Sequence, residues 1–114
     1  MVLAGSTGKA GAAGLTAIGT LRAGCGLCTL ALPETCQKAF ELHPMEVMTV
    51  PLPETQSGTL SMKAKEPILK LLEGKSVVAM GPGLTTESET VKLIGEVLPF
   101  IKCCLLYTSD AADE

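Results

Sequence analysis

Two glycine-rich segments carry the residues of this chain that could bind a ligand. The first, at 5–27, begins as the glycine loop GSTG and continues into a run of small residues. The second, Gly81-Pro82-Gly83-Leu84, directly follows the apolar run 76–80. A glycine loop between a strand and a helix offers backbone N–H groups and the positive end of a helix dipole to an anion. The same pattern also occurs as a tight strand-to-helix turn without a ligand, and the residues alone leave both interpretations open.

Neither loop matches a standard phosphate-binding motif. Gly8-Lys9 resembles the end of the P-loop pattern, but Leu3 and Ala10 stand where its first glycine and its Ser/Thr are required. The dinucleotide pattern G-x-G-x-x-G fails as well, because Thr29 and Thr86 occupy the third glycine position after each G-x-G pair. The sequence therefore predicts neither an ordinary P-loop nor an ordinary dinucleotide fingerprint.

The five cysteines do not form a metal or disulfide pattern. Cys25-x-x-Cys28 could be half of a zinc site, but no second pair follows at a suitable spacing, and the one histidine is His43. An odd count at irregular spacing is also poor for a disulfide framework. We therefore expect no metal site, and we expect Cys25, Cys28 and Cys36 to be small buried side chains in a reducing cytoplasm.

Patterns typical of helices and strands alternate around both loops. In chain order, the sequence predicts a strand stub at 1–4, a helix at 9–23, a strand at 27–32, a helix at 33–42, a strand within 45–52, a helix at 60–73, a strand at 76–80, and a helix after the capping-box pattern Thr86-x-x-Glu89. This alternation indicates an α/β layered fold with a mostly parallel sheet. Ligands bind such sheets at the carboxyl ends of the strands, where both glycine loops lie.

Local features of these elements are also predicted. Gly24 is expected to end the first helix, because glycine suits the left-handed conformation that follows a helix. Pro51 is expected to close the third strand, and Pro67 either kinks the helix at 60–73 or marks its true start. The expected buried faces are Ala13, Leu15, Ala17, Ile18 and Leu21 in the first helix and Val91, Ile94, Val97 and Leu98 in the last.

The overall composition excludes several classes of protein. The 114 residues suffice for one domain, and 46% of them are hydrophobic, which favours a buried core over disorder. A net charge of −3 without any Lys/Arg cluster argues against a nucleic-acid partner. No apolar run approaches the roughly 18 residues of a membrane span, and the N-terminus does not resemble a signal peptide. We therefore expect a cytoplasmic protein that does not engage a membrane.

Four short blocks of sequence, taken together in order, are more informative than any one of them alone. They are GSxxxxGA at 5–12, LRAGCGL at 21–27 with Pro33-Glu34 after the following strand, PMEVM at 44–48, and AMGPGL at 79–84. In order and spacing, across about residues 2–100, they resemble the start of the NAD(P)H-hydrate dehydratase domain, which belongs to the ribokinase-like superfamily. The last two blocks are similar to the P-x-E-V-M and G-P-G-L-G segments of that family.

The resemblance implies an enzyme that repairs damaged nicotinamide cofactors. Members of this family return hydrated NADH or NADPH, in which water has added across a ring double bond, to NAD(P)H. ADP in most bacterial members, or ATP in eukaryotic ones, phosphorylates the hydroxyl, because phosphate is a better leaving group than hydroxide. Mg²⁺ is expected to neutralise the nucleotide phosphates. A nucleotide, Mg²⁺ and hydrated NADH or NADPH are thus the implied partners of the intact enzyme.

The resemblance also assigns candidate substrate-binding residues. Ala12 and Gly83 fall in the two segments that are similar to the family's hydrated-cofactor site, and Gly11 and Gly81 shape the same loops. All four are expected to act through close backbone contact.

The sequence departs from the family pattern inside both loops. Thr85 stands where the family usually has the last glycine of G-P-G-L-G, and Lys9-Ala10 replaces the commoner Tyr-Thr. Arg22 and Glu46, which lie in matching blocks, are interpreted as structural polar residues.

The family's later motifs have no counterpart in this sequence. These are D-A-D, T-P-H-x-G-E, a K-G nucleotide segment, and G-T-G-D with the catalytic aspartate; Asp110 and Asp113 do not substitute for them. The chain is therefore predicted to supply part of the hydrated-cofactor site, with no catalytic residue and no nucleotide site, and to be inactive on its own.

Two regions are predicted along the chain. Residues 1–103 are interpreted as a partial dehydratase domain, truncated within the ribokinase-like fold. Residues 104–114, CLLYTSDAADE, resemble a translated sequencing adapter and are interpreted as a non-native tail; the alternative is an ordinary acidic C-terminus. The sequence leaves open whether an epimerase domain precedes this one and whether the intact enzyme is a homo-oligomer.

The predicted function is that of a fragment of an ADP-dependent (S)-NAD(P)H-hydrate dehydratase. One alternative is another ribokinase-like enzyme, a small-molecule kinase for a vitamin precursor, against which the G-P-G-L and P-x-E-V-M blocks argue. The other is a non-enzymatic nucleotide-binding module. The gene sequence on either side of this segment would distinguish them, because the dehydratase requires a G-T-G-D motif downstream.

Overall fold

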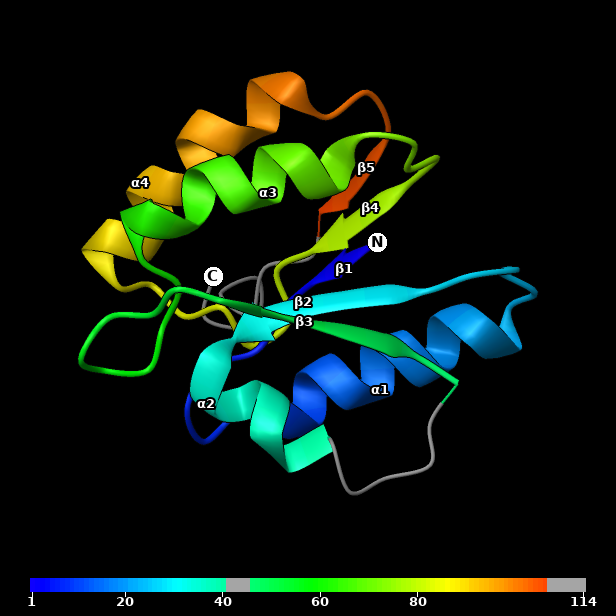
Figure 1. Ribbon diagram of the computed structural model, residues 1–114, viewed down its shortest axis with the longest axis horizontal. Coiled ribbons are helices and arrows are strands. Elements are labelled where there is room, and N and C mark those ends of the chain that lie inside the picture. Colours follow the sequence, from blue (N-terminus) through cyan, green and yellow to red (C-terminus); the bar gives the residue numbers. More distant parts are fainter. Residues whose placement is uncertain (41–45, 107–114) are drawn as a thin grey trace.

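Within residues 1–40 and 46–106, the part of the chain that the computed structural model describes, five parallel strands form one sheet (Figure 1). The strands are β1 (Val2–Leu3), β2 (Thr29–Pro33), β3 (Met48–Leu52), β4 (Val78–Met80) and β5 (Cys104–Leu106). Their order across the sheet is β3-β2-β1-β4-β5, and every pairing is parallel. The predicted α/β layered fold with a parallel sheet is confirmed.

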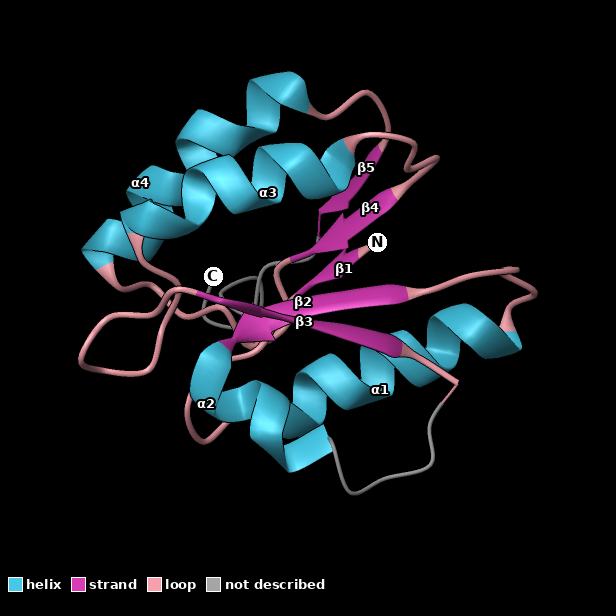
Figure 2. Cartoon of the chain, viewed as in Figure 1, coloured by secondary structure: helices cyan, strands magenta, loops and turns pink. Residues whose placement is uncertain are grey.

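Helices cover both faces of this sheet. They are α1 (Ala10–Arg22), α2 (Glu34–Gln37), α3 (Lys65–Leu72) and α4 (Ser88–Val97), with 3₁₀ turns at Lys38–Phe40, Met62–Ala64 and Leu98–Phe100. Figure 2 shows α1 and α2 on one side of the strands and α3 and α4 on the other. The chain thus forms the three layers expected of a ribokinase-like fold.

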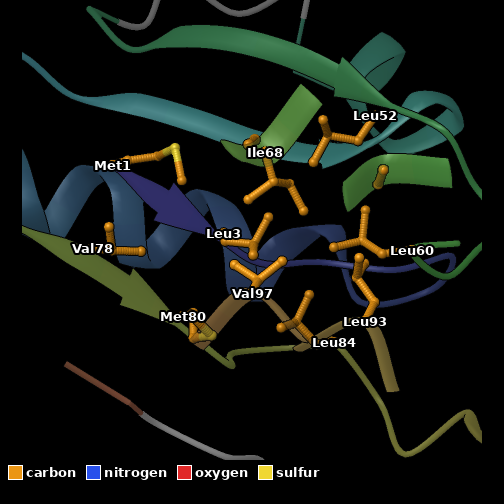
Figure 3. Close-up of a cluster of buried hydrophobic side chains, with 12 residues drawn as sticks. Met1, Leu3, Leu52, Leu60, Ile68, Val78, Met80, Leu84, Leu93 and Val97 are labelled. Atoms are coloured by element: carbon orange, nitrogen blue, oxygen red, sulfur yellow. The ribbon is translucent and has the colours of Figure 1, made fainter. Parts of the chain in front are cut away.

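The short strand β1 is the centre of the molecule. Its residues pair with β2 on one side and with β4 on the other. Because side chains alternate along a strand, Val2 packs into the core beneath α1, whereas Leu3 packs into the core beneath α3 and α4. Figure 3 shows Leu3 in one cluster with Ile68 of α3 and Val97 of α4. Burial of each such side chain contributes about 1.5–3 kcal/mol.

Small residues let α1 approach the sheet closely. Ala13 and Ala17 are buried as predicted, and Gly14 is buried with them. A Cβ on Gly14 would lie 2.9 Å from the ring of Phe40, so a larger residue at this position would force that ring to move. Leu15, which was predicted to be buried, is instead 76% exposed. It lies off the face that Ala13, Gly14 and Ala17 turn to the sheet.

The start of α4 differs from the prediction, and its buried face differs in part. The helix begins at Ser88, and no side chain caps its first turn. The Glu89 carboxylate accepts a hydrogen bond from the backbone N–H of Met62 at 3.1 Å, so the predicted capping box does not form. Of the predicted apolar face, Val97 is buried and Ile94 and Leu98 pack partly buried against the core. Thr90 and Leu93 are also buried, whereas Val91 is 55% exposed.

Two prolines and one glycine lie at the ends or the edge of the elements for which they were predicted to matter. Pro51 lies inside β3 rather than after it. Proline is tolerated there because β3 is at the edge of the described sheet, where an N–H is not needed. Pro67 is the third residue of α3 and so marks the start of that helix. Gly24 follows α1 with φ = 104°, as predicted for a helix-ending glycine.

Two of the sequence predictions fall partly outside the described residues. The end of the helix predicted at 33–42 and part of the PMEVM block lie in residues 41–45. Of the stretch predicted to be a non-native tail, residues 107–114 lie outside the described part, and β5 pairs with β4. The boundary between Cys103 and Cys104 stays a prediction.

Candidate ligand site at the strand ends

The two glycine loops meet at the carboxyl ends of β1 and β4. The Gly5 N–H donates to the Pro82 carbonyl at 2.9 Å, and the Gly81 N–H donates to the Leu3 carbonyl at 3.2 Å. From β1 the chain crosses to β2 on one side, and β4 lies on the other. In a parallel sheet that winds both ways from a central strand, this edge is the usual place for a ligand.

Gly83 fits against the beginning of α1. A Cβ at Gly83 would lie 3.0 Å from the Lys9 carbonyl oxygen and 3.3 Å from the Ala12 Cβ. Its φ of 75° also disfavours any other residue. The structure thus brings Gly83 and Ala12, two of the predicted site residues, into direct proximity.

The other two predicted site residues have different surroundings. Gly11 is exposed in the first turn of α1, and a Cβ there would meet nothing within 4 Å. Gly81 is buried at the end of β4, with φ = 125°. Gly11 therefore has an open surface that a ligand could approach, whereas Gly81 shapes the loop.

The beginning of α1 is electrostatically suited to an anion. No side chain caps the first turn, and it contains no acidic residue. The Ala12 N–H bonds back to the Lys9 carbonyl at 3.3 Å, whereas the N–H groups of Ala10 and Gly11 precede the first intrahelical bonds. Free N–H groups and the positive end of the helix dipole together favour negative charge at this end of α1.

A third loop, within residues 54–59, contacts the first glycine loop and was not predicted to do so. The Thr7 N–H donates to the Gly58 carbonyl at 2.9 Å. The Thr7 side chain fills the space that a Cβ on Gly58 would need, which explains the glycine. The hydroxyls of Thr55 and Thr59 bond to each other at 2.7 Å and close this loop. In the sequence, Gly58 was the only indication of this contact. It could not identify Thr7 as the contacting residue, because Thr7 lies far away along the chain.

Comparison with known proteins decides the family. A family model described as NAD(P)H-hydrate dehydratase matches residues 1–111. The chain belongs to the NAD(P)H-hydrate dehydratase family. It is 40% identical over 111 residues to the bifunctional NAD(P)H-hydrate repair enzyme Nnr of Moorella thermoacetica, covering 97% of this chain and 21% of that protein.

Enzymes of the same name from two further organisms are also similar. The identity to that of Pyrobaculum aerophilum is 35% over 97 residues, covering 85% of this chain and 19% of the relative. To that of Thermofilum pendens it is 33% over 110 residues, covering 96% and 21%. The chain therefore spans about a fifth of the length of the curated relatives it matches.

Thr85 has an unusual backbone conformation at a position where the dehydratase family pattern has glycine. Thr85 has φ = 72°, and it is the non-glycine residue of the described chain in the left-handed region. A β-branched side chain is strained in that conformation. This is the position at which the G-P-G-L-G pattern of the dehydratases carries glycine, so the loop keeps the backbone that a glycine would allow.

The cysteines and the remaining predicted polar residues differ in their burial. Cys28 and Cys36 are buried as predicted, and burial raises the pKa of both thiols. Cys25 was predicted to be buried but is exposed, because it lies in the turn after α1, and its thiol donates to the Leu27 carbonyl. Arg22 and Glu46 are both exposed.

Residues 1–40 and 46–106 contain no group of three or more His, Cys, Asp or Glu side chains placed to hold a metal ion. His43, the one histidine of the chain, lies outside these residues. In the same part of the chain, none of the helices combines the length and apolarity that a membrane span requires.

Proposed function

We propose that this chain is part of an (S)-NAD(P)H-hydrate dehydratase, an enzyme that removes water from hydrated NADH or NADPH and so repairs the cofactor. Within it, we assign the residues at 5–12 and 81–84 to the site of the hydrated cofactor. The observation that carries the proposal is the meeting of these two family blocks at the loop junction, where Gly83 packs against Lys9 and Ala12.

The loop junction suits the chemistry of a dinucleotide. Hydrated NADH carries a negatively charged diphosphate, and the uncapped beginning of α1 favours negative charge. Gly11 leaves the helix surface open to a ligand, while Gly81 and Gly83 let the second loop approach the first. We therefore assign Gly11 and Ala12 to direct contact with the cofactor, and Gly81 and Gly83 to the shape of the wall that they form.

We assign the nucleotide site, the Mg²⁺ ligands and the catalytic base to parts of the parent enzyme outside the described residues. In the parent, ADP or ATP supplies the phosphate that makes the hydroxyl a good leaving group. We further propose that the parent acts in the cytoplasm, where free thiols such as those of Cys25 and Cys103 persist.

The test uses the complete parent gene, recovered by extending the sequence on both sides. The purified protein is incubated with hydrated NADH, Mg²⁺ and either ADP or ATP, and the return of NADH absorbance is followed. We expect nucleotide-dependent turnover by the parent and none by the 114-residue chain. Absence of turnover by the folded parent with both nucleotides, or absence of a downstream G-T-G-D motif, would contradict the proposal.

A further inference from the structure

Ser6 holds a buried hydroxyl that the fold does not use. The residue is 1% exposed, and its Oγ is the buried side-chain polar atom without a hydrogen-bond partner in the described part of the chain. Other buried hydroxyls have partners. Thr90 donates to the Leu60 carbonyl at 2.8 Å, and the Ser61 hydroxyl accepts from the Lys63 N–H at 3.2 Å. An unpaired buried hydroxyl costs stability, so its presence calls for a partner from outside the described residues.

The backbone around Ser6 is fixed by all three loops of the site. Its neighbour Gly5 donates to Pro82, and its neighbour Thr7 donates to Gly58, both at 2.9 Å. The Ser6 carbonyl accepts from the Lys9 N–H at 2.8 Å, which places Ser6 in the turn that starts α1. Ser6 is therefore held at the loop junction, in the turn that leads directly into the free N–H groups of the helix.

We propose that the Ser6 hydroxyl binds the dinucleotide by donating a hydrogen bond to one of its phosphoryl oxygens. This rests on the proposed function, and it adds a residue and a chemical group to that site. The N–H groups of Ala10 and Gly11, which the start of the helix offers beside this turn, are also donors. A ligand that satisfies all of them must present several acceptors and a negative charge, as a diphosphate does.

The test compares two buried serines in the intact parent enzyme. Ser6→Ala removes a hydroxyl without a partner, so we expect an unchanged or higher melting temperature in the absence of ligand. We also expect its KM for hydrated NADH to rise about tenfold to a hundredfold, the loss of one hydrogen bond to a charged group. Ser61→Ala is the matched control, because it removes a hydroxyl that caps the turn at Met62–Ala64. It should lower the melting temperature and leave KM unchanged.

A binding assay tests the role of Ser6 independently of the proposed dehydration reaction. Thermal shifts of the parent and of both variants are titrated with NADH and with inorganic pyrophosphate. We expect both ligands to stabilise the parent and Ser61→Ala, and to stabilise Ser6→Ala only at higher concentrations. Equal ligand binding by Ser6→Ala and the parent, or a melting temperature lowered as in Ser61→Ala, would overturn the role of Ser6. A parent that binds both ligands through Ser6 but does not convert hydrated NADH would instead overturn the proposed reaction.

Discussion

At the scale of single residues, the site is built from backbone conformations that most side chains avoid. Gly5, Gly8, Gly81, Gly83 and Thr85 all have positive φ values. Four of these positions carry glycine, for which the conformation is free of strain. Thr85 is the exception, and it lies in the loop that also packs against α1.

Replacement of Thr85 by glycine should therefore stabilise the protein. Holding a β-branched residue at φ = 72° costs about 1–3 kcal/mol, while glycine loses about 0.4–1 kcal/mol through the greater freedom of the unfolded chain. The expected net gain is about 1 kcal/mol, measured by urea unfolding. Thr86→Gly is the control, because the neighbouring threonine is exposed and does not have a positive φ. It should be neutral or destabilising, and an equal gain in both variants would refute the strain at Thr85.

At the scale of elements, the contact between the second loop and the first turn of α1 keeps the site in shape. That contact depends on the absence of a side chain at Gly83, where the nearest atom to an added Cβ belongs to backbone. Backbone cannot rotate away as a side chain can, so any larger residue must move the loop or the helix.

Gly83→Ala and Gly11→Ala should have opposite effects on stability. The first adds a methyl group 3.0 Å from the Lys9 carbonyl oxygen at a positive φ, and it should cost about 1–3 kcal/mol. The second adds a methyl group in open space within a helix, and it should gain up to about 1 kcal/mol. Both free energies are measured by urea unfolding. In the parent enzyme, Gly11→Ala should nevertheless raise KM for hydrated NADH, because its surface is assigned to the ligand. A stabilised variant with unchanged KM would remove Gly11 from the site.

The sequence predicted the elements better than their contacts. Alternating patterns were sufficient for the order of strands and helices, because hydrophobic periodicity is local. The capping box of α4 was predicted wrongly, because Glu89 bonds to Met62, a residue 27 positions away, instead of capping its own helix. The same reason hid the third loop: Gly58 owes its identity to Thr7, and no local pattern connects them. Ser6 lies in one of the blocks that resemble the family, but the sequence could not show that its hydroxyl is buried without a hydrogen-bond partner.

At the scale of the whole molecule, the sheet has two strands at its ends. Within the described residues, β3 and β5 each pair on one side only. An edge strand presents unpaired N–H and C=O groups on which a second chain can add a strand. On β3, Pro51 interrupts that row, but Met48 is 48% exposed at the other end of the strand.

We therefore expect the isolated 114-residue chain to self-associate through this edge as its concentration rises, which light scattering coupled to size-exclusion chromatography would measure. Met48→Lys should shift the equilibrium toward the monomer, because a charge on an edge strand opposes the pairing of two copies. Leu15→Lys is the matched control: Leu15 is 76% exposed, but it lies on α1 and touches no strand edge. If Leu15→Lys disperses the chain as well as Met48→Lys does, association depends on exposed apolar surface rather than on β3. If the unmodified chain stays monomeric at all concentrations, the twist and the proline of β3 already protect the edge.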